Sequence, residues 1–301
     1  MTLQALKDRV LAHARQRPGG LDPFEIGLPG LSISVHQQPT DLFAVRYWPI
    51  FCLVLQGAKQ TSIGEQIVTF AAGRSVIIGV ELPTFARVLR ASTNEPYVAL
   101  SIHLDLSLLK ELGAELEGST RGESPLPAIA SGEADEAVMD AMSRLLGLVD
   151  KPAAISVLQP LIVREIHFWL LSAGHGAILR QIAHANTPTA RIAEAAARIR
   201  RTFAEPLHIP QLARETGMSE STFHLHFRTV CGTTPLQFQK RLRLLEARRL
   251  ILAEDHSVSA AALSVGYESP TQFSREFSRL FGLPPKRARQ AAGKEIQEVA
   301  V

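Results

Sequence analysis

Residues 257–285, SVSAAALSVGYESPTQFSREFSRLFGLPP, decide how the last third of this 301-residue chain folds. The same pattern occurs earlier, in PQLARETGMSESTFHLHFRTVCGTTP at residues 210–235. Matched positions lie 50 residues apart after the central turn, as Ser219 and Ser269 do, and 49 apart before it, as Gly217 and Gly266 do. Two copies of one unit this close together indicate an internal repeat. The other matched residues are Ser221, Phe223, Phe227, Gly232 and Pro235 in the first copy and Thr271, Phe273, Phe277, Gly282 and Pro285 in the second.

Each copy predicts a helix, a short turn that contains glycine, and a second helix. Gly217 and Gly266 supply the positive φ that ends a helix, and Ser219 and Ser269 suit the N-cap of the helix that follows. Pro270 occupies a first helical position, where its missing N–H costs nothing. This is the layout of a helix-turn-helix, whose second helix can lie in the major groove of DNA.

The second helix of each copy has one apolar and one polar face. Phenylalanines four residues apart predict the buried face. Arg can pair with guanine, Gln with adenine, and Ser or Thr with several partners, so the polar faces suit base edges and phosphates. The alternative is that these residues form an ordinary solvated helix face without contact to DNA. The residues expected to meet DNA are Ser221, His224, Leu225, Arg228, Thr271, Gln272, Ser274, Arg275 and Arg279.

A long helix is expected between the two copies. Thr234 can cap it, Pro235 can start it, and the helical pattern continues to about Ala253. At 1.5 Å per residue it spans roughly 25 Å, of the order of the ~34 Å that separates successive major grooves. The candidates for phosphate contact are Lys240, Arg248 and Arg249, although pairing with Glu246 and Glu254 competes for some of these cations.

Charge is distributed unevenly along the chain. Residues 191–290 carry 16 Lys/Arg and 9 Asp/Glu, a net charge of +7, whereas residues 1–190 carry 15 and 18, a net charge of −3. A basic block of this size suits a polyanionic partner, although a solvated basic surface has the same composition. With 46% hydrophobic and 20% charged residues the composition is that of a globular protein, and the length predicts about two domains.

Signals for membranes and disulfides are weak. Uninterrupted apolar runs such as 51–55 are much shorter than the ~18 residues that span a bilayer, and the helix-like stretch 2–17 is charged through its middle. Cys52 and Cys231 cannot form a disulfide framework or a cysteine-rich zinc site. We therefore expect a cytoplasmic, bacterial nucleoid-associated protein without membrane contact.

Residues 31–104 predict a β domain. Short apolar stretches recur between turn signals, with no long helix to interrupt them, which indicates an antiparallel barrel or sandwich. Alternation over 100–106 predicts a strand whose second face carries Ser101, His103 and Asp105. The expected strands are 31–36, 43–47, 51–56, 60–63, 66–70, 75–80, 85–89 and 97–104.

The pattern becomes helical after Leu106. We expect a polar loop at 118–132, helices at 134–149 and 155–185, and an interdomain joint at 186–188. The domains are then 1–185, a barrel with a helical connector, and 190–290, a helical domain. In the second connector helix a stripe suits either a dimer seam or burial within the protomer; it consists of Ile162, Ile166, His167 and Leu170.

Residues 191–290 resemble the DNA-binding domain of AraC/XylS-type transcription regulators. The resemblance implies a seven-helix domain with two helix-turn-helix units in adjacent major grooves. Ala261 departs from it, because the family usually has Ile or Val there, which predicts looser packing. The residues that carry the resemblance are Arg243, Ala247, Leu250, Ile251, the segment 261–269, Phe273, Phe277 and the segment 282–285.

The N-terminal half, over most of residues 20–180, resembles the cupin-like sensor domain of one AraC branch. CLVLQGAK at 52–59, AGR at 72–74 and PYVAL at 96–100 carry this resemblance, which implies effector binding or dimerisation. The expected fold class is multidomain α+β: an N-terminal antiparallel β-barrel (cupin-like) with a helical connector, and a C-terminal all-α domain with two helix-turn-helix units.

A cupin-type small-molecule enzyme or binding protein with a helical scaffold domain is the alternative. Cupin metal centres use two or three His plus a carboxylate, but this region offers only His36 and His103. No nucleophile–base arrangement is legible, so we expect no catalytic residue, metal or cofactor. The weak candidates for an effector pocket are Cys52, Arg74 and His103. Cys52 is either a reactive sensor thiol or a small buried hydrophobe.

The sequence therefore predicts a sequence-specific DNA-binding transcription regulator, controlled by an effector bound in the barrel. The expected partners are a double-stranded DNA operator, a small-molecule effector, a second copy of the chain in a homodimer, and RNA polymerase.

Overall fold

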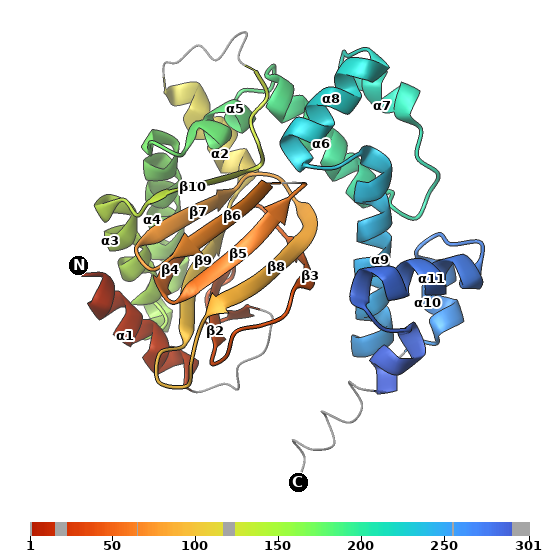
Figure 1. The fold of residues 1–301 in the computed structure, drawn as a ribbon. Coiled ribbons are helices and arrows are strands. Elements are labelled where there is room, and N and C mark those ends of the chain that lie inside the picture. The colour runs from red at the N-terminus through yellow and green to blue at the C-terminus, as the bar shows by residue number, and fades with distance from the viewer. Residues whose placement is uncertain (1, 16–22, 65, 117–123, 255, 291–301) are drawn as a thin grey trace.

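A computed structural model describes residues 2–15, 23–64, 66–116, 124–254 and 256–290 (Figure 1). Two antiparallel sheets face each other in the N-terminal half, helices cover one side of them, and a helical domain stands on the other side. The expected barrel, connector and helical domain are confirmed.

The first sheet has six strands in the order β1-β2-β9-β4-β7-β10, and the second has four in the order β3-β8-β5-β6. β4 lies between β9 and β7, as its continuous apolar sequence predicts for a central strand. Side chains from the sheets and the covering helices form one core, in which Phe51, Leu53 and Val76 are almost fully buried. The strands are β1 (Phe24–Glu25), β2 (Leu31–His36), β3 (Phe43–Tyr47), β4 (Ile50–Gln56), β5 (Ala58–Ile63), β6 (Gln66–Ala71), β7 (Arg74–Ile78), β8 (Leu82–Arg90), β9 (Tyr97–His103) and β10 (Ile129–Glu133).

All eight expected strands are present, but three details differ from the prediction. β1 is an additional strand, and β10 forms inside the segment expected to be a loop because it pairs with the edge of β7, with Ile129 opposite Ile78. The strand expected at 100–106 ends at His103. Asp105 leaves the sheet because its carboxylate caps the next helix and accepts hydrogen bonds from the backbone N–H groups of Ser107 and Leu108.

The helices of the N-terminal half are α1 (Leu3–Ala14), α2 (Leu106–Glu115), α3 (Glu136–Leu146), α4 (Pro152–Ser172) and α5 (Ala177–Ala183). The single helix expected at 155–185 is wrong, because the chain breaks between α4 and α5. Gly176 lies at this break, where a Cβ would collide with the carbonyl oxygen of Leu170.

α4 packs against α2 and α3. The stripe that suggested a dimer seam faces inward, with Ile166 and His167 fully buried, so burial within the protomer is the correct alternative. By length and composition alone α4 could cross a membrane, which is weak evidence because core helices pass the same test.

The joint between the two halves is tightly packed. Thr187 caps α6 (Pro188–Arg201) by accepting a hydrogen bond from the N–H of Ala190, and its own hydroxyl donates to the carbonyl of Gln181. Thr189 is fully buried and bonds to the Gln181 side chain. α6 therefore starts from a buried polar network rather than from a loose linker.

The remaining helices are α7 (Ile209–Glu215), α8 (Glu220–Cys231), α9 (Pro235–Ala253), α10 (Val258–Ser264) and α11 (Pro270–Phe281), and the backbone is helical again at 285–290. α9 has the expected bounds and joins two helix-turn-helix units, α7–α8 and α10–α11. The first unit shares one hydrophobic core with the barrel, whereas the second has a separate core. Ala261, where the family usually has a larger residue, is fully buried in that second core.

Candidate nucleic-acid interface and effector cavity

The two helix-turn-helix units use the same local chemistry. The hydroxyl of Ser219 accepts a hydrogen bond from the N–H of Thr222, and that of Ser269 from the N–H of Gln272. Gly217 and Gly266 have φ values of +64° and +85°, and a Cβ on Gly266 would also collide with the carbonyl of Ala204. The caps and turns predicted from the repeat are confirmed.

The inner faces of α8 and α11 are aromatic. Phe223, Phe227, Phe273 and Phe277 are all 0% exposed, as their four-residue spacing predicts. Phe227 packs edge-on against Phe238 of α9, with ring centroids 5.4 Å apart. These contacts fix the rotation of each helix, so the opposite face points away from the core.

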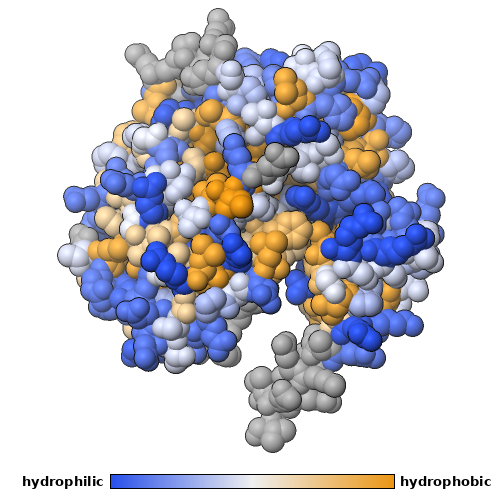
Figure 2. Space-filling model, viewed as in Figure 1, coloured by the Kyte–Doolittle hydropathy of each residue, from blue (hydrophilic) through white to orange (hydrophobic). Residues whose placement is uncertain are grey.

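The outer faces carry the residues expected to meet DNA. Eight of these nine residues are exposed and Ser274 is half-buried, while neither His224 nor Arg275 turns into the interior. The Gln272 amide donates to the Glu276 carboxylate on its own helix at 3.2 Å. Figure 2 shows a broad hydrophilic surface over the helical domain on the right of the molecule. Both faces are thus free to meet a partner.

The phosphate candidates on α9 are differently placed. Lys240 pairs with Glu276 of α11 at 2.8 Å, and Arg249 pairs with Glu246 and Glu254, each at 2.7 Å. Arg248 lies over the ring of Phe281, 5.3 Å from its centroid. Arg248 and Arg249 also line a cavity against the barrel. These contacts compete for the three cations, but exposed ion pairs are weak, so phosphate contacts by Lys240, Arg248 and Arg249 stay a prediction.

Arg243 has a structural role that the sequence did not reveal. Its guanidinium donates to the carbonyl oxygens of Phe203 at 2.6 Å and Gly266 at 2.8 Å, and to those of Ala204 and Glu205, both at 3.0 Å. It thereby ties the loop after α6 and the turn of the second unit to α9. The resemblance pointed to Arg243, but no local pattern indicates four carbonyl partners.

The barrel and the helical domain share a buried ion pair. Glu81, between β7 and β8, contacts Arg46 of β3 at 2.5 Å and Arg200 of α6 at 3.0 Å. Burial raises the pKa of the Glu81 carboxyl, while both arginines act to lower it. The indole of Trp48 lies under the Arg46 guanidinium at 4.3 Å. Glu81 therefore links the barrel to the helical domain.

The end of α8 also docks on the barrel. The backbone N–H of Ala128 donates to the carbonyl of Val230 at 2.9 Å. Gly64, after β5, lies so close to Gly232 that neither position has room for a Cβ. The first unit is therefore fixed to the barrel by backbone contacts as well as by its core.

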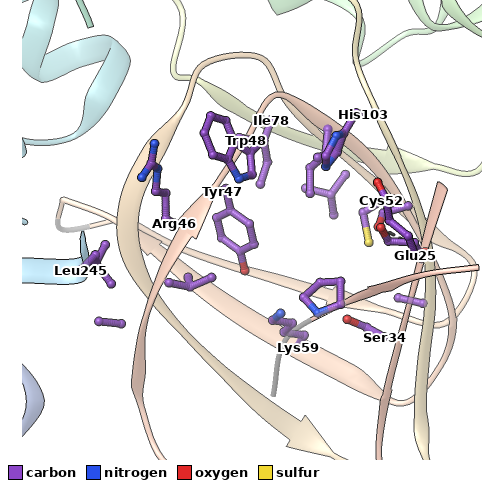
Figure 3. A pocket seen from close by; sticks show the side chains of 18 of the residues that line it. Glu25, Ser34, Arg46, Tyr47, Trp48, Cys52, Lys59, Ile78, His103 and Leu245 are labelled. Atoms are coloured by element: carbon purple, nitrogen blue, oxygen red, sulfur yellow. Dashed lines mark hydrogen bonds between the residues drawn. The ribbon is translucent and has the colours of Figure 1, made fainter. Parts of the chain in front are cut away.

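A cavity of about 570 Å³ opens between the two sheets and is bounded on one side by α9 (Figure 3). Cys52 and His103 line it, as expected, but Arg74 does not, because it is exposed at the start of β7. Burial raises the pKa of the Cys52 thiol to about 11, which disfavours a reactive thiolate, and the side chain is half-buried at the wall of the cavity. Lys59, Tyr47 and Trp48 also line the cavity, and sequence reasoning missed them.

Across the ranges that the structure describes, no group of three or more His, Cys, Asp or Glu side chains lies close enough to hold a metal ion. His36 is buried beside Tyr97, with ring centroids 5.9 Å apart.

Comparison with known families agrees with this architecture. A sequence model described as "AraC-type transcriptional regulator N-terminus" matches residues 27–178, and one described as "Helix-turn-helix domain" matches residues 212–291. The chain belongs to the AraC family of transcription regulators. The resemblance noted in both halves of the sequence is thus confirmed.

Two relatives with known roles align with this AraC-family chain. The transcriptional activator RhaS of Salmonella schwarzengrund is 30% identical over 167 residues, which is 54% of this chain and 58% of RhaS. The virulence regulon activator VirF of Yersinia enterocolitica is 26% identical over 207 residues, 67% of this chain and 75% of VirF. The chain thus spans little more than half of the length of RhaS.

Among solved structures, ToxT from Vibrio cholerae with a bound unsaturated fatty acid has the same two-domain fold. The TM-score is 0.59 at 9% identity, and the match covers 88% of this chain and 97% of ToxT. At this identity the likeness concerns the fold alone.

Proposed function

We propose that this AraC-family protein is a sequence-specific DNA-binding transcription regulator whose activity is controlled by a small molecule bound in the barrel. The observation that carries the proposal is the pair of helix-turn-helix units whose outer faces leave eight of nine candidate residues exposed. The units are joined by α9, whose 19 residues correspond to roughly 28 Å, comparable to the ~34 Å of one DNA turn. The domain assignment 1–185 and 190–290 is part of this proposal.

Base reading is assigned to the outer faces of α8 and α11. Arg275 and Arg228 suit guanine, and His224 and Thr271 offer shorter polar contacts. Phosphate contacts are assigned to Lys240, Arg248 and Arg249 of α9, whose intramolecular pairs a phosphate would displace, and to exposed residues outside α9 such as Arg214, Lys286 and Arg287.

The decisive experiment measures binding of the full-length protein to the DNA upstream of its own gene, by fluorescence anisotropy against random duplex of equal length. The double variant His224→Ala/Arg275→Ala is expected to lose the preference for the cognate duplex. Arg87→Ala, which removes an exposed arginine on β8 of the barrel, is the matched control and is expected to bind like the wild type. Equal affinity of the wild type for cognate and random DNA across all tested upstream fragments would contradict sequence-specific recognition.

Effector control is supported by the position of the cavity. Its wall combines both sheets with Leu245, Glu246 and Leu252 of α9, the helix that joins the two units. A ligand there touches the barrel and the DNA-binding domain together. The enzyme alternative has no comparable support, because RhaS and VirF are both transcriptional activators.

The remaining partners belong to the same proposal. The outer face of α4 exposes Val157 and Leu161, which are four residues apart and 64% and 60% exposed. This apolar face suits a second copy in a two-fold homodimer. Light scattering of wild type and Leu161→Lys tests it, and a wild type that is monomeric at micromolar concentration would contradict it. RNA polymerase contact and a cytoplasmic, nucleoid-associated location follow from the regulator role.

A further inference from the structure

Lys59 is a buried cation that faces the cavity. It lies on β5 and its residue is only 6% exposed, yet it lines the open space between the sheets. Among the residues that the structure describes, no carboxylate lies within ion-pair distance of its ammonium group. The ammonium group lies beside two aromatic rings: Nζ is 5.6 Å from the ring centroids of both Phe43 and Tyr47.

An uncompensated ammonium group in this position is unfavourable. Removing a charge from water carries a large desolvation cost, which proteins offset with a counter-charge or with several hydrogen bonds. Two rings at the outer limit of cation–π distance offset only part of that cost. The protein maintains this charge beside a cavity, so the missing counter-charge has space to arrive from solution.

The surroundings of Lys59 suit one end of an amphiphile. Figure 3 shows the hydroxyl groups of Tyr47 and Ser34 directed toward the part of the cavity where the Lys59 side chain ends. Both hydroxyls can donate to an anion. Further along, the walls are apolar, formed by Ile50, Phe70, Val76 and Ile78.

Lys59 differs from the other cations of the wall. Arg46 pairs with Glu81, Arg249 pairs with Glu246 and Glu254, and Arg248 lies over the ring of Phe281. The cavity also meets Leu245 and Leu252 of α9. A ligand that fills it therefore has an anionic group at Lys59 and an apolar body that reaches the DNA-binding domain.

We propose that the cavity binds a monocarboxylate with an apolar body, and that the carboxylate pairs with Lys59. This rests on the proposed function, because it assigns a ligand class to the effector site. A single lysine with two hydroxyls matches the charge of one carboxylate, whereas phosphate favours arginine forks, and Arg46 and Arg249 of the wall are paired with carboxylates.

The test compares acids with neutral analogues of the same shape. Binding of dodecanoate and 1-dodecanol, and of 2-naphthoate and 2-naphthol, to the full-length protein is measured by isothermal titration calorimetry below the micelle concentration. At least one acid is expected to bind about tenfold or more tightly than its alcohol. Lys59→Met is expected to reduce that acid's affinity to the level of the alcohol, while Lys110→Met, which removes an exposed lysine on α2, leaves it unchanged.

Two further measurements separate a binding role from a structural one. Ligand-free Lys59→Met is expected to melt at the same temperature as the wild type or higher, because an unpaired buried charge has been removed. Tyr47→Phe keeps the shape of the site and is expected to weaken acid binding severalfold without affecting the alcohol.

Several results would overturn the ligand class. They are failure of all four probes to bind, equal binding of acid and alcohol, persistence of the acid preference in Lys59→Met, or a lower melting temperature of that ligand-free variant. DNA binding is measured in parallel on the same preparation. Specific DNA binding without acid binding rejects the ligand class and leaves the proposed function intact. Acid binding without specific DNA binding rejects the proposed function and leaves the ligand class intact.

Discussion

Replacing Phe273 with Ala is expected to unfold the second helix-turn-helix unit while the first stays folded. Phe273 is 0% exposed and packs against Tyr267 and Phe277, with ring centroids 5.3 and 5.5 Å apart. Truncating a buried phenylalanine costs about 3–5 kcal/mol. The core around it contains only ten buried apolar residues, spread over the end of α9, α10 and α11. A core of that size supplies about 3–5 kcal/mol in total, so the substitution removes most of it.

The first unit differs because its core is continuous with the barrel. Phe223→Ala removes an equally buried ring, but there the loss is shared by a much larger cluster. The two variants have the same chemistry, so they form a matched pair. Phe223→Ala is expected to lower the melting temperature of the whole protein without abolishing its cooperative fold.

Hydrogen exchange followed by mass spectrometry distinguishes the two cases. In Phe273→Ala, peptides from 258–281 should exchange at close to the unfolded rate, while peptides from 188–231 and from the strands keep their protection. Cognate DNA binding should fall to the level of a single unit. If both units lose protection together, or if 258–281 remains protected, the separation of the two cores is energetically unimportant and this reasoning is wrong.

Three other predictions follow from the described contacts. Arg275→Ala should cost about 1–3 kcal/mol of binding to cognate DNA and little on random DNA, with Arg87→Ala as control; equal losses on both duplexes would reject base reading. Burial lowers the pKa of His167, whose Nε2 accepts from the N–H of Asp105 at 2.9 Å, so its contribution to stability is complete above the unfolded pKa of about 6.5 and is lost as the pH falls below it. Chemical denaturation between pH 5 and 7.5 should show this slope in the wild type and a shallower one in His167→Gln; identical slopes would exclude His167 as its source. Arg243→Lys keeps the charge but cannot reach four carbonyls, so it should lower the free energy of unfolding by about 2 kcal/mol, and an unchanged denaturation midpoint would refute the clamp.

The strands and the helix-turn-helix units could be predicted because their signals are local. Turn residues separate each apolar run, and Ser219 and Ser269 cap helices whose phenylalanines repeat every four residues. β10 could not be predicted in this way, because IASGE has little intrinsic strand preference and becomes a strand only beside β7. The break before α5 likewise depends on how closely Gly176 approaches the end of α4.

In the candidate site, too, features with a local signal could be predicted and features that depend on distant parts of the chain could not. Helical periodicity identifies the outer faces of α8 and α11, because the buried phenylalanines fix the inner face and the residues on the opposite side of the helix must point outward. The same periodicity could not show how the cations of α9 are paired, because that helix is covered on two sides by different parts of the protein. Lys240 meets Glu276 of α11, while Arg249 lies beside the barrel cavity. Lys59 was missed because a lysine in a strand is ordinarily read as solvent-facing, and only the closed sheet shows that it points inward.

The two units are attached to the barrel unequally, and this difference allows a ligand in the cavity to affect DNA binding. The first unit is held to the barrel by a shared core and by backbone contacts at Val230 and Gly232. The second is connected through α9, which the barrel contacts through side-chain pairs such as Arg46 with Glu246, at 3.8 Å. Simultaneous occupation of adjacent major grooves requires a fixed spacing between the two reading helices. A ligand that contacts Leu245 and Glu246 acts on the only rigid rod among the described residues that sets this spacing, so it can change DNA binding without touching either reading face.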